Sequence, residues 1–253
     1  MPRRRLLIVA ALLVAVVAAG LVAAVAGGLL LRDTSQPASV AAALRLFRRD
    51  DPDPSGAEGV YVYDTSGWES LRVLSGPTHR YPATTTITLT RAGCGIRLRW
   101  QPLAARSTTW TLCRGDTGLV VTANDEVHTF YGVTDHTSYT CTGDWPSAAA
   151  PGTRRPFGCR AADGRERGVA TLVGRGPVTV GDARIEATHV RTTATVSGGN
   201  HGSETVDWWI APGTPAPIRI VLSSRTSRHV AIVGTARYRE HAVLRLASPK
   251  ALR

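Results

Sequence analysis

The sequence predicts a mainly β domain that follows one membrane-spanning helix. From Gly59 onward, short runs of Val, Ile, Thr, Tyr and Trp alternate with Gly, Pro, Asp and Ser, which is typical of strands joined by turns. Helical periodicity is essentially absent from this part, so the strands are expected to form one antiparallel meander. An uncharged apolar run, Leu6–Leu31, precedes the domain.

The apolar run is long enough to cross a bilayer, because about 20 apolar residues span the hydrocarbon core as a helix. Three arginines at positions 3–5 precede the run, whereas Arg32 on its other side is next to Asp33. Cytoplasmic flanks carry the excess of positive charge. Residues 1–5 are therefore expected in the cytoplasm, residues 6–31 in the cell membrane and the domain on the extracytoplasmic side.

A cleaved signal peptide is the alternative for this segment. Ala24 and Ala26 form a small-x-small site behind a basic start. The apolar stretch before that site is longer than the about 7–15 residues of a signal peptide, which favours an uncleaved, single-pass anchor.

Residues 32–57 are expected to connect the anchor to the domain. Apolar residues recur at helical spacing within Ser39–Arg48, which predicts a short amphipathic helix. A linker that is helical only in part is the alternative, since ten residues barely sustain a helix without packing. The breaker-rich segment Asp50–Gly56 ends any helix. The β domain is then expected over residues 58–248, with 249–253 as a C-terminal tail.

The expected strands differ in length but share a content of β-branched and aromatic residues. In chain order they are Val60–Tyr63, Glu69–Leu74, Thr84–Thr90, Ile96–Gln101, Thr108–Cys113, Leu119–Thr122, Glu126–Tyr131, Thr137–Cys141, Gly168–Val173, Val178–Val180, Ile185–Val196, Glu204–Ile210, Pro217–Ser224, His229–Val233 and Ala236–Leu246. The apolar phase shifts within Ile185–Val196, which predicts a bulge near His189.

Four cysteines in an exported domain favour disulfides over a metal site, because that compartment is oxidising and no C-x-x-C spacing occurs. One of the three possible pairings has geometric support. If Pro102–Ala105 forms a four-residue turn with Gln101 opposite Arg106, Cys94 lies opposite Cys113, at the about 5.5 Å Cα spacing that a bridge needs.

The remaining Cys141 and Cys159 would then pair by exclusion. The same register places Arg97 and Arg99 beside Trp110, where an arginine on the indole would make a cation–π contact.

The formal net charge is +11, which could favour anionic lipids, acidic polysaccharides or nucleic acid. However, Lys250 is the only lysine, and the arginines are scattered along the chain with few aromatic residues between them. The use of arginine in place of lysine, with abundant Ala, Val, Gly and Thr, indicates codon bias in a high-GC genome. Because the basic residues are scattered, no nucleic-acid partner is expected.

Several short motifs together cover most of Gly59–Leu246. They are Tyr81–Thr90, Gly93–Gly95, Leu98–Trp100, Arg106–Trp110, Leu112–Cys113, His128–Gly132, Tyr139–Cys141 and Asp207–Thr214. With them the chain resembles a largely uncharacterised family of membrane-anchored extracytoplasmic proteins of high-GC bacteria. A long meander with a helix near its start is also similar in architecture to the lipoprotein-carrier fold (LolA/LppX-like). That second resemblance implies a curved half-barrel sheet around a lipid, although a fold alone does not assign a function.

The most suggestive polar group is Asp125, His128, Asp135 and His136. It comes without an H-E-x-x-H, G-x-S-x-G or S-x-x-K pattern. A polar turn between two strands is therefore favoured over a metal or hydrolytic site, and no catalytic residue, metal or cofactor is expected.

Three tryptophans are candidate ligand-binding residues: Trp100, Trp208 and Trp209. Adjacent strand residues face opposite sides, so one of Trp208 and Trp209 should enter the core while the other lies outside or in a groove. A core residue with a covering neighbour is the favoured interpretation of this pair.

These observations favour a non-catalytic binding module for an apolar or amphiphilic cell-envelope ligand such as a lipid. The first alternative is a structural or accessory domain that docks onto another envelope protein. The second is a hydrolase, in which His128 and His136 would be the first residues to test.

Overall fold

The computed structural model describes residues 35–49, 57–73, 78–115, 118–230 and 234–253. The elements in chain order are α2 (Val40–Arg49), β1 (Gly59–Arg72), β2 (Thr78–Arg80), β3 (Thr84–Ala92), β4 (Gly95–Leu103), β5 (Arg106–Arg114), β6 (Leu119–Phe130), β7 (Val133–Thr142), β8 (Arg154–Arg160), β9 (Gly164–Val180), β10 (Ala183–Gly198), β11 (His201–Ile210), β12 (Arg219–Val230) and β13 (Gly234–Leu246).

The predicted anchor Leu6–Leu31 and the predicted breaker segment Asp50–Gly56 lie outside these residues, so both stay predictions. Within the part of the chain that the structure describes, no helix has the length and apolar character needed to cross a membrane.

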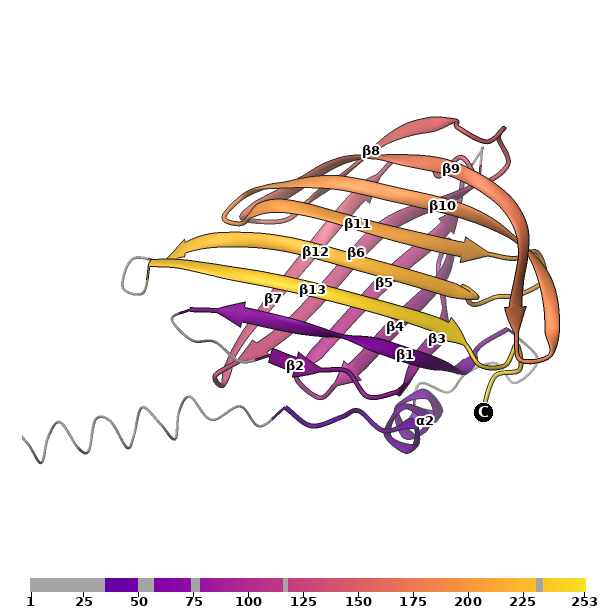
Figure 1. Ribbon diagram of the computed structural model, residues 1–253, viewed down its shortest axis with the longest axis horizontal. Coiled ribbons are helices and arrows are strands. Elements are labelled where there is room, and N and C mark those ends of the chain that lie inside the picture. Colours follow the sequence, from indigo (N-terminus) through magenta and orange to yellow (C-terminus); the bar gives the residue numbers. More distant parts are fainter. Residues whose placement is uncertain (1–34, 50–56, 74–77, 116–117, 231–233) are drawn as a thin grey trace, which may run out of the picture.

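All strands belong to one 13-stranded antiparallel sheet in which successive strands from β3 to β13 pair with one another. The first half of β1 pairs with β3, and its second half pairs with both β2 and β13. Without β2, the strands form a closed ring, flattened into two facing walls (Figure 1). The expected meander is confirmed, but the expected half-barrel is wrong: the ladder from Tyr63↔Leu246 to Arg72↔Arg237 joins the two ends of the sheet.

Four of the observed strands each replace two shorter predicted ones: β1, β6, β9 and β12. In β1 the ladder continues through Ser66 and Gly67, which look like turn residues in the sequence. Gly67 is needed there because a Cβ atom would lie 2.2 Å from the backbone oxygen of His241 on β13. Close approach of two backbones, and not a turn, explains this glycine.

Strand β8 was not predicted, since Arg154–Arg160 contains a proline and lacks apolar alternation. It pairs with the end of β7 only over residues 140–142. There Cys141 lies directly opposite Cys159, and their disulfide has a Cα–Cα distance of 4.0 Å.

The Cys94–Cys113 disulfide is also present, with a Cα–Cα distance of 5.1 Å, so both predicted pairings are confirmed. The predicted register of this hairpin is wrong by one residue, because Gly95 lies opposite Cys113. An irregularity between Trp100 and Leu103 absorbs the difference and leaves Leu103 opposite Arg106.

This register decides which side of the sheet Trp110 faces. Trp110 lies opposite Leu98, and both are buried in the barrel, whereas Arg97 and Arg99 are exposed. The predicted cation–π contact of these arginines with Trp110 is therefore wrong.

The predicted bulge near His189 is confirmed by a register shift between His189 and Val190. Beyond it the β9–β10 hairpin bends out of the wall, as Figure 1 shows, and its residues Val180 and Ala187 belong to the buried core. The same core cluster contains the fully buried side chains of Trp100, Trp208, Leu172, Ile220 and Leu244.

The short helix is confirmed as α2, which lies outside the barrel near β1 and β3 (Figure 1). The Ser39 hydroxyl accepts a hydrogen bond from the backbone N–H of Ala42 and caps the helix. Phe47 is its buried residue. At the other end of the chain, Leu252 exchanges backbone hydrogen bonds with Val60, so the expected C-terminal tail reaches β1.

Candidate functional site

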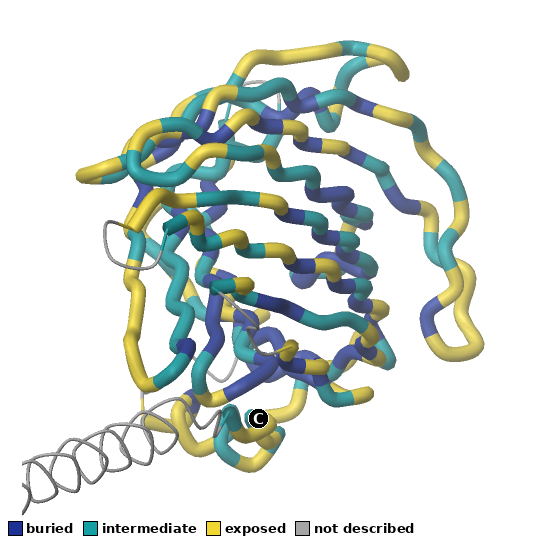
Figure 2. The backbone as a smooth tube through the Cα atoms, turned by 60° about the vertical axis from the view of Figure 1, so that its left-hand side comes forward, coloured by how far each residue is buried: buried dark blue, intermediate teal, exposed yellow. Residues whose placement is uncertain are grey.

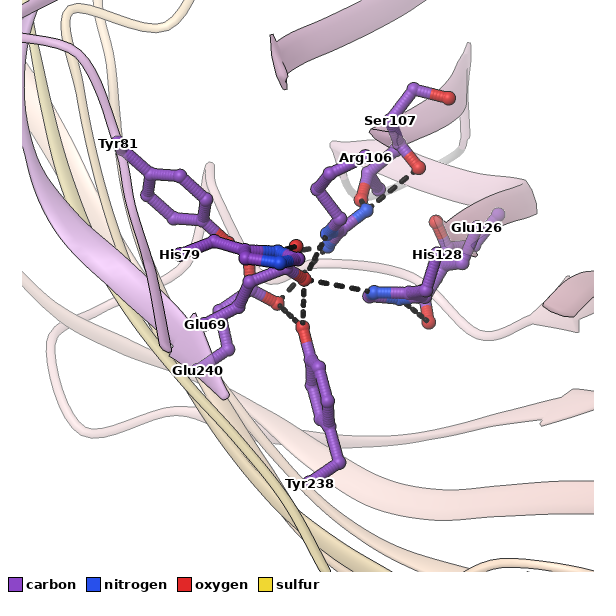
Figure 3. Close-up of polar contacts among 11 residues, drawn as sticks. Glu69, His79, Tyr81, Arg106, Ser107, Glu126, His128, Tyr238 and Glu240 are labelled. Atoms are coloured by element: carbon purple, nitrogen blue, oxygen red, sulfur yellow. Dashed lines mark hydrogen bonds and ion pairs between the residues drawn. The ribbon is translucent and has the colours of Figure 1, made fainter. Parts of the chain in front are cut away.

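Two glutamates lie directly opposite each other where the barrel closes. Glu69 of β1 and Glu240 of β13 are cross-strand partners, and both are buried. Two like charges in this position repel each other unless a cation lies between them. Arg106, from the facing wall, supplies this cation: its Nη2 lies 3.0 Å from Glu240 Oε2 and its Nε 3.8 Å from Glu69 Oε2 (Figure 3).

Hydrogen bonds satisfy both carboxylates further. The Tyr238 hydroxyl lies 2.7 Å from Glu240 Oε2 and 3.1 Å from Glu69 Oε2, so its single proton is shared between the two oxygens. Tyr81 donates to Glu240 Oε1 at 2.5 Å, and His79 Nδ1 lies 2.9 Å from Glu69 Oε1. A buried ionic group is tolerated only when it is paired and hydrogen-bonded in this way.

His128 extends the network toward the open side of the barrel. Its Nδ1 lies 3.2 Å from Glu69 Oε2, and its Nε2 lies 3.8 Å from Glu126 Oε2. Burial alone would raise the pKa of Glu69, but the hydrogen bonds with His128 and His79 and the charge of Arg106 lower it to about 2. Burial opposes charge on His128 as well, yet its bonds with Glu126 and Glu69 raise its pKa.

We call these eight residues the seam cluster: Glu69, His79, Tyr81, Arg106, Glu126, His128, Tyr238 and Glu240. Its members come from β1, β2, β5, β6, β13 and the residue that follows β2 (Figure 3). The cluster ties the closing strands to the facing wall. Both ring nitrogens of His128 face carboxylates, and among the described residues no hydroxyl is hydrogen-bonded to either nitrogen.

A cavity of about 470 Å³ adjoins the seam cluster, and Glu126, His128 and Tyr238 belong to its lining. This volume is within the about 300–1,000 Å³ of typical small-molecule pockets. The apolar residues that line this cavity come from both walls of the barrel: Leu71, Phe130, Val133, Val196, Val230 and Ala236.

The rim of this cavity exposes apolar side chains to solvent. Val133, at the start of β7, is 72% exposed, and Val230, at the end of β12, is 37% exposed. Few large apolar residues of the described part are exposed, so two at one rim mark a surface that can contact an apolar molecule. The tube in Figure 2 shows the strand ends of this side of the barrel as mostly exposed or partly buried.

Two further carboxylates, Glu166 of β9 and Glu204 of β11, line the same cavity. Burial and the charge of Glu126 raise the pKa of Glu166 to about 8. Burial, followed by the charges of Glu166 and Glu126, raises the pKa of Glu204 well above its ordinary value. The charge of Arg106 opposes this shift at Glu204. In contrast to the glutamates of the seam cluster, neither Glu166 nor Glu204 forms an ion pair with another described residue.

None of the three candidate tryptophans lies in the lining of this cavity, although Trp208 lines a smaller one that shares Glu166 and Glu204 with it. Trp100 is buried and donates to the Thr85 hydroxyl at 3.1 Å, and Trp208 packs edge-on against Trp110 in the core. Trp209 lies on the outer face, stacked on His189 with 4.0 Å between ring centroids. The predicted alternation of Trp208 and Trp209 is confirmed, and none of the three candidates lines the 470 Å³ cavity.

The predicted polar group around β6 is divided between the two faces of the sheet. His128 and Asp135 line the cavity, whereas Asp125 lies on the outer face under α2 and His136 is exposed. No group of three or more His, Cys, Asp or Glu residues in the described ranges could hold a metal ion.

Sequence reasoning missed Glu69, Arg106 and Glu240. One signal was present in β13, where Glu240 continues the alternation of Ala242, Leu244 and Leu246, all of which face the core. A charged residue in the apolar phase of a strand indicates a buried partner.

Comparisons with known proteins do not assign this chain to a family. No family model matches the chain, and no curated protein matches it. Among solved structures, the hypothetical lipoprotein YmcC from Escherichia coli (K12) aligns over 81% of this chain and 96% of its own, with 11% identity and a TM-score of 0.30. A likeness at this level carries no functional argument.

Proposed function

We propose that this chain is a non-catalytic binding protein that takes the apolar part of an amphiphilic molecule into the open end of its barrel. The 470 Å³ cavity carries this proposal, because it combines an apolar wall, a polar floor and a rim of exposed valines. Sites for small ligands typically join an apolar lining with a few polar groups that orient the ligand.

The predicted anchor and its orientation supply the second part of the proposal, which is the location of the barrel. If Leu6–Leu31 spans the cell membrane with the three arginines inside, the barrel stands at the outer face, where amphiphilic envelope molecules are present. Two disulfides agree with an oxidising compartment.

The proposal is tested by photocrosslinking. The full chain in phosphatidylcholine nanodiscs is exposed to a neutral alkyl alcohol with a diazirine in its chain, and the labelled peptides are identified by mass spectrometry. We expect labels on the peptides that carry Phe130, Val133 and Val230, in addition to any label on the anchor.

Two neighbouring substitutions provide the matched comparison. Ala236→Trp fills the cavity, whereas Thr235→Trp places the same side chain on the exposed face of β13. The first should abolish cavity labelling and the second should retain it, with thermal unfolding of both variants to establish that the barrel is folded. Labelling confined to the anchor, or unchanged labelling in folded Ala236→Trp, would contradict the proposal.

A further inference from the structure

We propose that the ligand carries a primary ammonium group, which binds between Glu166 and Glu204 while its hydrocarbon part occupies the 470 Å³ cavity. This inference depends on the proposed binding function and names the ligand class. It rests on the positions of the two carboxylates, on an unpartnered buried acceptor beside them and on the size of the space that they enclose.

The two carboxylates point into the barrel from strands on either side of β10. Glu166 lies opposite Val196 of β10, and Glu204 lies opposite Ala194, so both follow the inward phase of their strands. Glu166 is only 7% exposed. Glu204 is partly buried. Neither carboxylate has a hydrogen-bond or ion-pair partner among the described residues, although a carboxylate as buried as that of Glu166 normally has one.

A second, smaller cavity of about 40 Å³ shares Glu166 and Glu204 with the large one. The two carboxylates therefore stand at the boundary between the cavities. Asn124 lines the small cavity and is 6% exposed. Its Nδ2 donates to Glu126 Oε1 at 3.0 Å, which leaves its Oδ1 as a buried acceptor without a partner.

The partner that the two carboxylates and Asn124 Oδ1 lack is a hydrogen-bond donor with positive charge. An ammonium has three N–H donors and no acceptor, which matches two carboxylates and one amide oxygen. The small cavity has about 40 Å³ of space, which is enough for an ammonium group. A trimethylammonium has no N–H and therefore could not satisfy these acceptors.

The surroundings favour an organic cation. Trp110, Trp145 and Trp208 line the small cavity, and indole rings attract cations through their faces. Burial, followed by the charges of neighbouring carboxylates, raises the pKa of Glu166 and of Glu204, so ionisation of these groups is unfavourable without a counter-ion. A bound ammonium would supply this counter-ion.

The test uses four photoprobes with the same diazirine-bearing alkyl chain and different head groups: primary ammonium, trimethylammonium, hydroxyl and carboxylate. Each is titrated on the full chain in phosphatidylcholine nanodiscs, and labelling of the cavity peptides is quantified by mass spectrometry. The primary ammonium probe should reach half-maximal labelling at a concentration about tenfold lower than the hydroxyl probe, equivalent to about 1.4 kcal/mol. The carboxylate probe should label most weakly.

Substitutions then assign the preference to the two carboxylates. Glu166→Gln and Glu204→Gln keep the side-chain shape and should each reduce the preference for the ammonium probe over the hydroxyl probe. Glu186→Gln, on the exposed part of β10, should leave it unchanged. Because the glutamine variants remove unpaired buried acids, we expect them to fold, and thermal unfolding checks this.

The outcomes separate this inference from the proposed function. Equal cavity labelling by the ammonium and hydroxyl probes, or equal labelling by primary ammonium and trimethylammonium, overturns the inference and leaves the binding function intact. A preference that persists in both folded glutamine variants also overturns it. If no probe labels the cavity, the proposed function fails as well.

Discussion

Replacing Arg106 by methionine tests the role of the seam cluster. Arg106 is 1% exposed and faces two carboxylates that are almost completely buried. Removing one partner of a buried ion pair typically costs about 3–5 kcal/mol, because the remaining charge is buried without compensation. With a urea slope of about 2 kcal/mol/M, a loss of about 4 kcal/mol lowers the unfolding midpoint by about 2 M.

The assay is urea unfolding of the full chain in nanodiscs, followed by tryptophan fluorescence. All six tryptophans lie downstream of Leu6–Leu31, so the signal reports the barrel. The matched control is Arg99→Met, which removes an exposed arginine from β4 and should change the free energy of unfolding by less than about 0.5 kcal/mol.

The ion pairs of the seam cluster also predict that the free energy of unfolding depends on pH. The lowered pKa of Glu69, about 2, stabilises the folded protein above about pH 4.5, and this contribution is lost as the pH falls toward 2. In Arg106→Met the buried glutamates accept protons more readily, so the loss of stability should be smaller at pH 4 than at pH 7. Adding Glu240→Gln should recover part of it. A loss below about 1 kcal/mol, equal at both pH values, would refute the reasoning.

Three further predictions concern other parts of the barrel. Cys159→Ala removes the disulfide to Cys141, 18 positions away, and should cost about 3 kcal/mol in urea unfolding. Reduction of the unmodified protein, which also opens Cys94–Cys113, should cost more. Leu98→Ala, at a fully buried position, should cost about 2–5 kcal/mol, whereas a cost near zero would contradict its place in the core. Because the pKa of Glu166 is raised to about 8, stability should fall as the pH rises from about 4.5 to 8; Glu166→Gln should remove this fall in thermal unfolding.

Much of the fold follows from local patterns. β-branched and aromatic residues indicated strands over most of the barrel, and the phase shift near His189 correctly indicated a bulge. Both disulfides were also predictable, because the hairpin brings Cys94 close to Cys113 and the other two cysteines then pair by exclusion. The register of β4 and β5 was not, because the irregularity after Trp100 depends on which side chains the closed interior accepts.

Most of the candidate site could not be predicted from the sequence. Of the polar group predicted around β6, His128 and Asp135 face the cavity, and His128 meets Glu69, which is 59 positions away. Arg106 and Glu240 are 134 positions apart. Local spacing contains no information about such contacts, because they form only after the strands between them have paired.

The sequence by itself determined the class of the domain, most strand positions and the disulfide partners, and it predicts an anchor that lies outside the described residues. These depend on short-range periodicity, on composition and on cysteines close in the chain. Only the tertiary structure decided that the sheet closes and that its interior contains a charged seam beside a cavity. The reason is that β1 and β13, which close the ring and place Glu69 opposite Glu240, are near opposite ends of the domain.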